Sequence, residues 1–184
     1  FPTFRCAEQL RNDVGYHNLS VTVVTVGGGL AYGNLGYSHH AIQDLGLMRL
    51  FPEFEIASPG DPIETEMCLN YLLKNAGPSY LRLKKAGEPN YNLEIKELKA
   101  GIWNEIVAPK NSKIFLATSG GLHIAQKLRN ANSEYSDYGI YTCPLWGAKF
   151  KDMQQNQIDL FDEIITVEDH LLDCGFGSWI RESV

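Results

Sequence analysis

The sequence lacks the patterns of a membrane-spanning or nucleic-acid-binding protein. No apolar run approaches the roughly 18–20 residues that cross a bilayer. The 16 Lys and Arg residues are dispersed through a chain of net charge −6, whereas a nucleic-acid surface needs clustered basic residues. We therefore expect no contact with membranes or nucleic acids.

Cysteine is scarce, and its spacing excludes the common metal motifs. The four residues Cys6, Cys68, Cys143 and Cys174 form no C-x-x-C pair, and no His/Cys cluster has the spacing of zinc ligands. Cys68 falls inside a helical pattern, where it is expected to pack as a small buried hydrophobe. Reduced structural thiols predict a cytoplasmic protein, and we expect no metal ligands within the chain.

The sequence does contain a regular alternation of strand-like and helical segments. Apolar residues make up 44% of the 184 residues, which is enough for a packed core. The alternation predicts the α/β class, with two mainly parallel three-layer α/β units. We place the first unit at residues 1–98, a linker at 99–111 and the second unit at 112–184.

The expected elements follow from apolar periodicity and from turn residues. In the first unit we expect helices at about 3–13, 40–51 and 62–77, and strands at 21–26, 54–57 and 79–83. In the second part we expect a short edge strand around 103–107, strands at 113–118, 138–141 and 163–167, and helices at 122–129 and 158–161.

Two short motifs predict helix starts. Asp61 can cap the helix that begins at Pro62, while Glu64 reaches back as in a capping box. We expect the inner face of this helix to be Ile63, Met67, Tyr71 and Leu72. The Gly120-Gly121 turn can bind phosphate through its N–H groups. It lacks the spacing of the phosphate-binding fingerprints, so tight packing of strand onto helix is the favoured interpretation.

Two adjacent histidines, His39 and His40, follow a glycine-rich turn beyond the strand expected at 21–26. Loops at this end of a strand are the usual place for sites in open α/β sheets. Paired histidines are nevertheless more often structural than catalytic, so histidine chemistry alone predicts little.

A wider pattern around these histidines resembles the transketolase family. The resemblance to the pyrimidine-binding domain is carried by Gly36-Tyr37-Ser38-His39-His40-Ala41-Ile42-Gln43-Asp44, Met48-Arg49, Phe51-Pro52, Ser58-Pro59-Gly60-Asp61, Glu64-Thr65-Glu66 and the strand Gly77 to Leu83. Ile165-Thr166-Val167-Glu168-Asp169-His170 and Gly175-Phe176-Gly177-Ser178 resemble the carboxy-terminal domain of the family.

The resemblance implies a thiamine diphosphate-dependent transferase that moves two-carbon ketol units between sugar phosphates. It also implies that the diphosphate, with Mg²⁺ or Ca²⁺, is held by a domain absent from this chain, across a subunit interface. The expected partner is therefore the diphosphate-binding domain or subunit of the same enzyme, in a homo- or hetero-oligomer such as a dimer.

Family motifs assign the expected site residues. His39 corresponds to the active-site histidine, beside Ser38, which is expected to contact substrate. His40 is expected to point elsewhere and cap its own helix. Phe1 and Phe4 fall where the family stacks the aminopyrimidine ring, although core packing explains Phe4 equally well.

The chain departs from the family pattern at the substrate end. Leu35 stands where many sugar-phosphate transketolases have an acidic residue, and a second family histidine falls within Gly27-Gly28-Gly29. The arginine that holds the substrate phosphate corresponds to Lys84 or Lys85, and a solvated surface role is an equal alternative for this pair.

Three alternatives stay open: the beta subunit of a 2-oxo acid dehydrogenase, a deoxyxylulose-phosphate synthase portion, and a non-catalytic assembly module. The chain begins at Phe1 without a Met, which suggests a trimmed or partial chain. It contains no Gly-Asp-Gly metal motif, and Glu8 follows the phenylalanines instead of preceding them as the cofactor-binding glutamate of the family does. We therefore expect this chain alone to be inactive.

Overall fold

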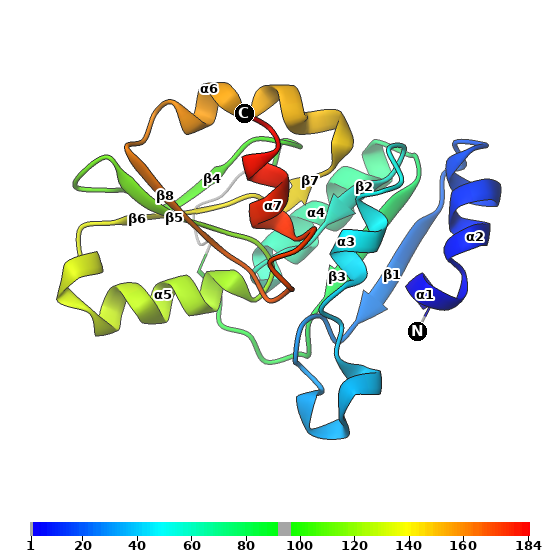
Figure 1. The fold of residues 1–184 in the computed structure, drawn as a ribbon, viewed down its shortest axis with the longest axis horizontal. Helices are drawn as coiled ribbons and strands as arrows, with labels where there is room; N and C mark the ends of the chain where they lie inside the picture. The colour runs from blue at the N-terminus through cyan, green and yellow to red at the C-terminus, as the bar shows by residue number, and fades with distance from the viewer. Residues whose placement is uncertain (1, 92–96) are drawn as a thin grey trace.

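The computed structural model describes residues 2–91 and 97–184 as two four-stranded sheets with flanking helices (Figure 1). The first sheet consists, in spatial order, of β1 (Thr22–Val26), β3 (Ser79–Leu83), β2 (Glu55–Ala57) and β7 (Leu145–Trp146). The second consists of β4 (Asn104–Val107), β6 (Gly139–Thr142), β5 (Lys113–Ala117) and β8 (Glu163–Val167). Each sheet has three parallel strands and one antiparallel edge strand, which confirms the predicted class.

The helices lie mostly where periodicity predicted them. They are α1 (Pro2–Arg5), α2 (Ala7–Gln9), α3 (Asp44–Met48), α4 (Pro62–Lys74), α5 (Gly121–Ala131), α6 (Gln155–Ile158) and α7 (Phe176–Arg181). A π-helical segment, Leu10–Gly15, continues α2, and 3-10 turns occupy Gly33–Leu35, Tyr37–His39, Ser133–Tyr135 and Ala148–Met153. The helix expected at 158–161 lies earlier in the chain, as α6.

The helix expected at 40–51 is shorter than predicted, because the chain is extended where it should begin. Ala41 and Gly29 exchange two backbone hydrogen bonds of 2.9 Å, and His40 has φ −79° and ψ 113°. The pairing of Ala41 with Gly29 holds this segment in a β-bridge, and α3 begins only at Asp44. The prediction that His40 caps its own helix is therefore wrong; its Nε2 lies 3.2 Å from the Gly33 carbonyl oxygen instead.

The start of α4 confirms the predicted cap. The Asp61 carboxylate accepts from the Glu64 backbone N–H at 2.8 Å, and Pro62 occupies the first turn. The inner face is rotated from the predicted stripe. Its fully buried members are Glu64, Cys68 and Leu72, whereas Ile63, Met67 and Tyr71 are only half-buried. Cys68 packs as the expected small hydrophobe.

One hydrophobic core joins the two sheets through an element that periodicity did not predict. β7 comes from the second half of the chain but pairs with β2, with Trp146 opposite Ile56. Its Trp146 ring packs against Phe176 and Trp179 of α7, with centroid separations of 5.4 and 5.3 Å. The domain boundaries at 98 and 112 stay a prediction.

The junction of β5 and α5 generates a stability prediction. A Cβ on Gly121 would overlap the Val167 carbonyl oxygen at the end of β8, so the Gly-Gly turn serves close packing, as favoured above. We expect Gly121→Ala to lower the free energy of unfolding by about 1–3 kcal/mol, because backbone atoms must move apart. Urea unfolding measures this difference.

Gly77→Ala is the matched control, since a Cβ there meets no described atom within 4 Å. Equal stability of the Gly121→Ala variant and the control would contradict the packing interpretation.

Candidate functional site

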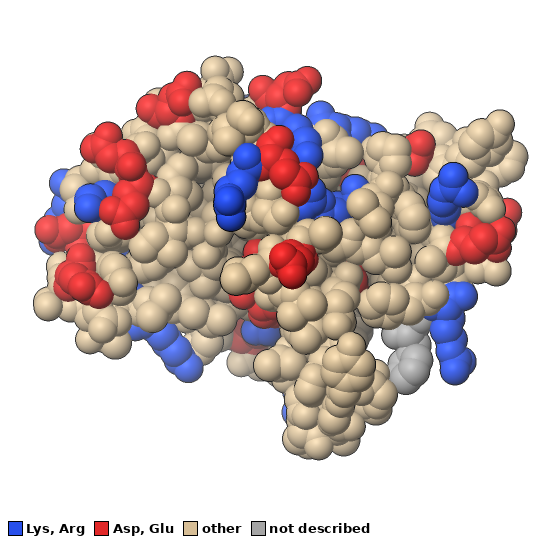
Figure 2. All heavy atoms as spheres, viewed as in Figure 1, with Lys and Arg blue, Asp and Glu red and all other residues tan. Residues whose placement is uncertain are grey.

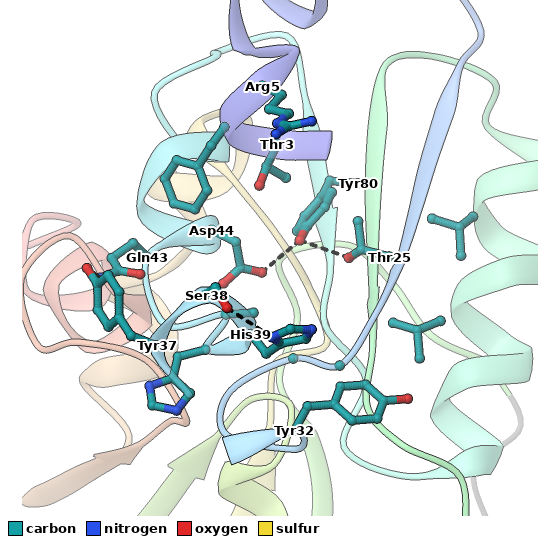
Figure 3. Close-up of a pocket in the computed structure, with 17 residues that line it drawn as sticks. Thr3, Arg5, Thr25, Tyr32, Tyr37, Ser38, His39, Gln43, Asp44 and Tyr80 are labelled. Atoms are coloured by element: carbon teal, nitrogen blue, oxygen red, sulfur yellow. Dashed lines mark hydrogen bonds between the residues drawn. The ribbon is translucent and has the colours of Figure 1, made fainter. Parts of the chain in front are cut away.

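A cavity of about 780 Å³ opens at the carboxyl end of β1 (Figure 3). Its walls come from α1, the end of β1, the loop before α3, and β3. The lining residues are Thr3, Phe4, Arg5, Val24, Thr25, Val26, Gly27, Gly28, Tyr32, Tyr37, Ser38, His39, His40, Ala41, Gln43, Asp44 and Tyr80. The predicted place for a site, beyond the carboxyl end of the strand, is thus a real cavity.

The glycines after β1 shape the floor of this cavity. Gly27 has φ +100°, and a Cβ there would lie 2.6 Å from ring atoms of Tyr32. A Cβ on Gly28 would lie 2.9 Å from the guanidinium carbon of Arg82. These positions stay side-chain-free so that an aromatic ring and a buried cation can approach the backbone.

Ser38 and His39 lie together on the exposed side of the cavity. Both belong to the 3-10 turn Tyr37–His39, and Ser38 Oγ lies 3.1 Å from His39 Nδ1. His40 turns toward Gly33, and its ring packs edge-on against Tyr37. The structure therefore brings Ser38 and His39 to the cavity, while their chemical roles stay a prediction.

The loop around these residues carries little charge. Residues 14–43 contain no Asp, Glu, Lys or Arg. The projection at the bottom of Figure 2, which is the segment between β1 and α3, shows almost no charged side chain on this face. Among the described lining residues Arg5 is the one Lys or Arg side chain.

A chain of buried polar side chains forms the rear wall. Thr25 Oγ1 donates to Tyr80 Oη at 2.9 Å, and Tyr80 Oη donates to Asp44 Oδ2 at 2.7 Å (Figure 3). Arg82 Nε donates to the same Asp44 oxygen at 2.9 Å. Burial, and then the charge of Asp44, raises the pKa of Tyr80, so its hydroxyl keeps its proton.

Arg82 connects this wall to the second sheet. Its guanidinium is fully buried and also donates to Asp169 Oδ1 at 2.6 Å and to Ser119 Oγ at 2.8 Å. Burial alone would lower the pKa of Arg82, but the carboxylates of Asp169 and Asp44 outweigh it and raise the pKa. Sequence reasoning missed Arg82, although a charge inside the apolar strand Ser79–Leu83 is a signal for buried partners.

Only some of the other predicted site residues line the cavity. Phe4 lines the cavity and is 56% exposed, whereas Phe1 lies outside the described residues. Lys84 forms an ion pair with Glu88 at 3.0 Å, and neither Lys84 nor Lys85 lines the cavity. Of the predicted set, the cavity therefore brings together Phe4, Ser38 and His39.

The cavity suits a flat aromatic ring better than a charged diphosphate. Phe4, Tyr32 and Tyr37 offer aromatic faces, and Val24 and Val26 add apolar surface. The described residues contain no group of three or more His, Cys, Asp or Glu side chains that could hold a metal ion. The residues present thus fit an aminopyrimidine ring but not a metal-bound diphosphate.

A second buried carboxyl lies at the junction of the sheets. Glu64 accepts from the Gly60 N–H at 2.7 Å and from the hydroxyl of Thr142 at the end of β6, and its Oε1 lies 3.5 Å from Asn104 Nδ2. Burial raises the pKa of Glu64 to about 7, despite these hydrogen bonds, and the nearby Asp61 charge adds to the effect.

Comparison with known proteins finds a family model that resembles the cavity-bearing half. Residues 1–89 match the model of the transketolase pyrimidine-binding domain. No helix in the described part of the chain is long and apolar enough to span a bilayer.

The similar proteins extend the likeness to the whole chain. A subunit of the apulose-4-phosphate transketolase of Actinobacillus succinogenes is 29% identical over 98% of this chain and 58% of its own length. The 1-deoxy-D-xylulose-5-phosphate synthase of Aquifex aeolicus is 28% identical over 97% of this chain and 28% of its own. A solved split-gene transketolase, an inactive beta4 tetramer, has a TM-score of 0.81 at 23% identity, covering 100% of this chain and 59% of that one. The chain thus spans less than two thirds of these relatives.

The raised pKa of Glu64 generates a pH prediction. Between about pH 4.5 and 7 the folded chain holds a proton that the unfolded chain has lost, so the free energy of unfolding falls as pH rises through this window. The slope is at most about 1.4 kcal/mol per pH unit. We expect Glu64→Gln to gain roughly 2 kcal/mol relative to the wild type between pH 5 and 7, as measured by urea unfolding.

Glu66→Gln, on the exposed face of α4, is the control and should leave the wild-type slope intact. If the free energy of unfolding of Glu64→Gln changed with pH in the same way as that of the wild type, the raised pKa could not belong to Glu64.

Proposed function

We propose that this chain is a portion of a transketolase-like protein and forms the pyrimidine-binding side of an enzyme that transfers two-carbon ketol units between sugar phosphates with thiamine diphosphate. The observation that supports this best is the cavity itself. It lies within the residues that match the pyrimidine-binding domain, and it combines an aromatic wall with Ser38 and His39.

In this proposal the cavity-lining side chains have roles that their positions permit, whereas the role of Lys84 or Lys85, which do not line the cavity, comes from the family motif alone. Thiamine diphosphate, when bound, supplies the electron sink for breaking a carbon–carbon bond. Phe4 stacks on the pyrimidine ring, and His39 exchanges a proton with substrate hydroxyls, because a histidine can do so near neutral pH. Ser38 holds the His39 ring through Nδ1 and contacts substrate. Lys84 or Lys85 contacts the substrate phosphate.

The proposal includes a partner that holds the diphosphate with Mg²⁺ or Ca²⁺. Two observations support it: the relative from Actinobacillus succinogenes is one subunit of its transketolase, and the similar split-gene structure is described as an inactive beta4 tetramer. The complete assembly is then a homo- or hetero-oligomer with the cofactor between subunits. Cytoplasmic location belongs to the same proposal, and four free cysteines agree with it.

A deoxyxylulose-phosphate synthase is the second candidate, because such an enzyme from Aquifex aeolicus matches at 28% identity. The complete assembly separates the two candidates: ketol transfer between sugar phosphates supports the first, and pyruvate-dependent condensation supports the second. Pyruvate decarboxylation without condensation indicates the 2-oxo acid dehydrogenase alternative, and absence of all three reactions supports an assembly module.

The position of His39 generates the first functional prediction. In the complete assembly we expect His39→Ala to lower kcat by about 10²-fold or more, on the usual magnitude of proton-transfer catalysis. His17→Ala, which changes an exposed histidine outside the cavity, is the control. Steady-state kinetics with saturating cofactor measures both variants. An unchanged kcat for His39→Ala would remove this residue from the mechanism.

The second functional prediction concerns the chain by itself. Ring stacking contributes about 1–2 kcal/mol, whereas even millimolar binding requires about 4 kcal/mol. We therefore expect the 184-residue chain to bind no thiamine diphosphate measurably in calorimetric titration with magnesium. Addition of the diphosphate-binding partner should restore binding. Micromolar affinity of the chain alone would show that the site is placed wrongly.

A further inference from the structure

The rear wall of the cavity has a defined hydrogen-bond direction. Asp44 Oδ2 is a carboxylate oxygen, so it accepts from both Tyr80 Oη and Arg82 Nε. The hydroxyl proton of Tyr80 is thereby used in the hydrogen bond to Asp44. The Tyr80 oxygen can then only accept a hydrogen bond from Thr25. Thr25 Oγ1, at 2.9 Å, therefore donates its proton to Tyr80.

The reverse direction is disfavoured by charge. If Tyr80 donated to Thr25, the buried Asp44 oxygen would lose a charge-assisted hydrogen bond, which is roughly twice as strong as a neutral one. Asp44 is 2% exposed, so its burial leaves little access for a solvent donor in place of Tyr80. The Asp44 carboxylate, paired with Arg82, thus orients the hydroxyl group of Tyr80 and, through it, the hydroxyl group of Thr25.

The consequence reaches the cavity at Thr25. A threonine hydroxyl has one proton and two lone pairs. The proton is directed into the wall, so Thr25 offers only lone pairs to a ligand in the cavity that it lines. Figure 3 shows this residue at the end of the chain of dashed bonds from Asp44.

The exposed side of the cavity, with Ser38 and His39, does not impose a fixed hydrogen-bond direction on a ligand. The hydroxyl of Ser38 and the ring of His39 are joined by one hydrogen bond whose direction depends on the histidine tautomer. The Ser38 hydroxyl can therefore take either role in this bond. Thr25 is a position where the hydroxyl of an otherwise adaptable side chain is held in one polarity.

We propose that Thr25 is a specificity-determining residue: a fixed acceptor that selects ligands with an N–H or O–H donor at this point of the cavity. The inference rests on the proposed function. If the ligand is thiamine diphosphate, the donor is the exocyclic 4′-amino group, because the ring nitrogens of the pyrimidine only accept.

The test compares two ligands in the complete assembly with its diphosphate-binding partner. The probes are thiamine diphosphate and its 4′-oxo analogue, which carries a carbonyl oxygen in place of the amino group. Calorimetric titration with magnesium gives both dissociation constants for the wild type, Thr25→Val, Thr25→Ser and Tyr80→Phe. Thr25→Val keeps the shape and removes the acceptor, and Thr25→Ser restores the hydroxyl.

We expect Thr25→Val to weaken thiamine diphosphate by roughly 5- to 10-fold, the value of one hydrogen bond, and to leave the 4′-oxo analogue unchanged or bound more tightly. Thr25→Ser should bind both ligands as the wild type does. Tyr80→Phe frees the Thr25 proton, so it should improve binding of the 4′-oxo analogue.

Equal weakening of both ligands by Thr25→Val would show a packing role only and overturn this inference, while the proposed function would stand. Unchanged binding of both ligands would overturn it in the same way. If the wild-type assembly binds neither ligand, the proposed function fails and the inference fails with it.

Discussion

The buried guanidinium of Arg82 is the interaction on which the other contacts of the site depend. It lies on the third strand of the chain, and its carboxylate partners come from α3 and from the loop after β8. Arg82 forms an ion pair with each carboxylate, and Asp44 Oδ1 and Asp169 Oδ2 have no hydrogen-bond partner among the described residues. Removing one member of such a cluster leaves buried charge uncompensated, which is the expensive case for ionic groups in a protein interior.

This cluster explains why one side of the cavity is fixed and the other is adaptable. Arg82 holds the Ala41 carbonyl at 2.7 Å, and through Asp44 it orients Tyr80 and then Thr25. The opposite side is the exposed 3-10 turn with Ser38 and His39. In the proposed function, a wall with preset polarity faces the turn with Ser38 and His39, an arrangement that would hold a ring while chemistry proceeds beside it.

The two sheets are joined by more than this cluster. Glu64 links the start of α4 to β6, and Trp146 of β7 joins the first sheet to α7. Both are buried contacts between residues far apart in the sequence.

The sequence by itself determined the α/β class, the positions of the longer strands, the capped start of α4 and the loop that carries His39, because each depends on local periodicity or on turn and cap chemistry. It could not determine that Ala41 pairs with Gly29 and delays α3, that β7 returns to the first sheet, or that Phe4 lies at the cavity while Lys84 does not. Nor could it show which carboxylates neutralise Arg82. These outcomes depend on contacts between distant segments, whose energies come from burial and electrostatics in the assembled fold and leave no periodic trace along the chain.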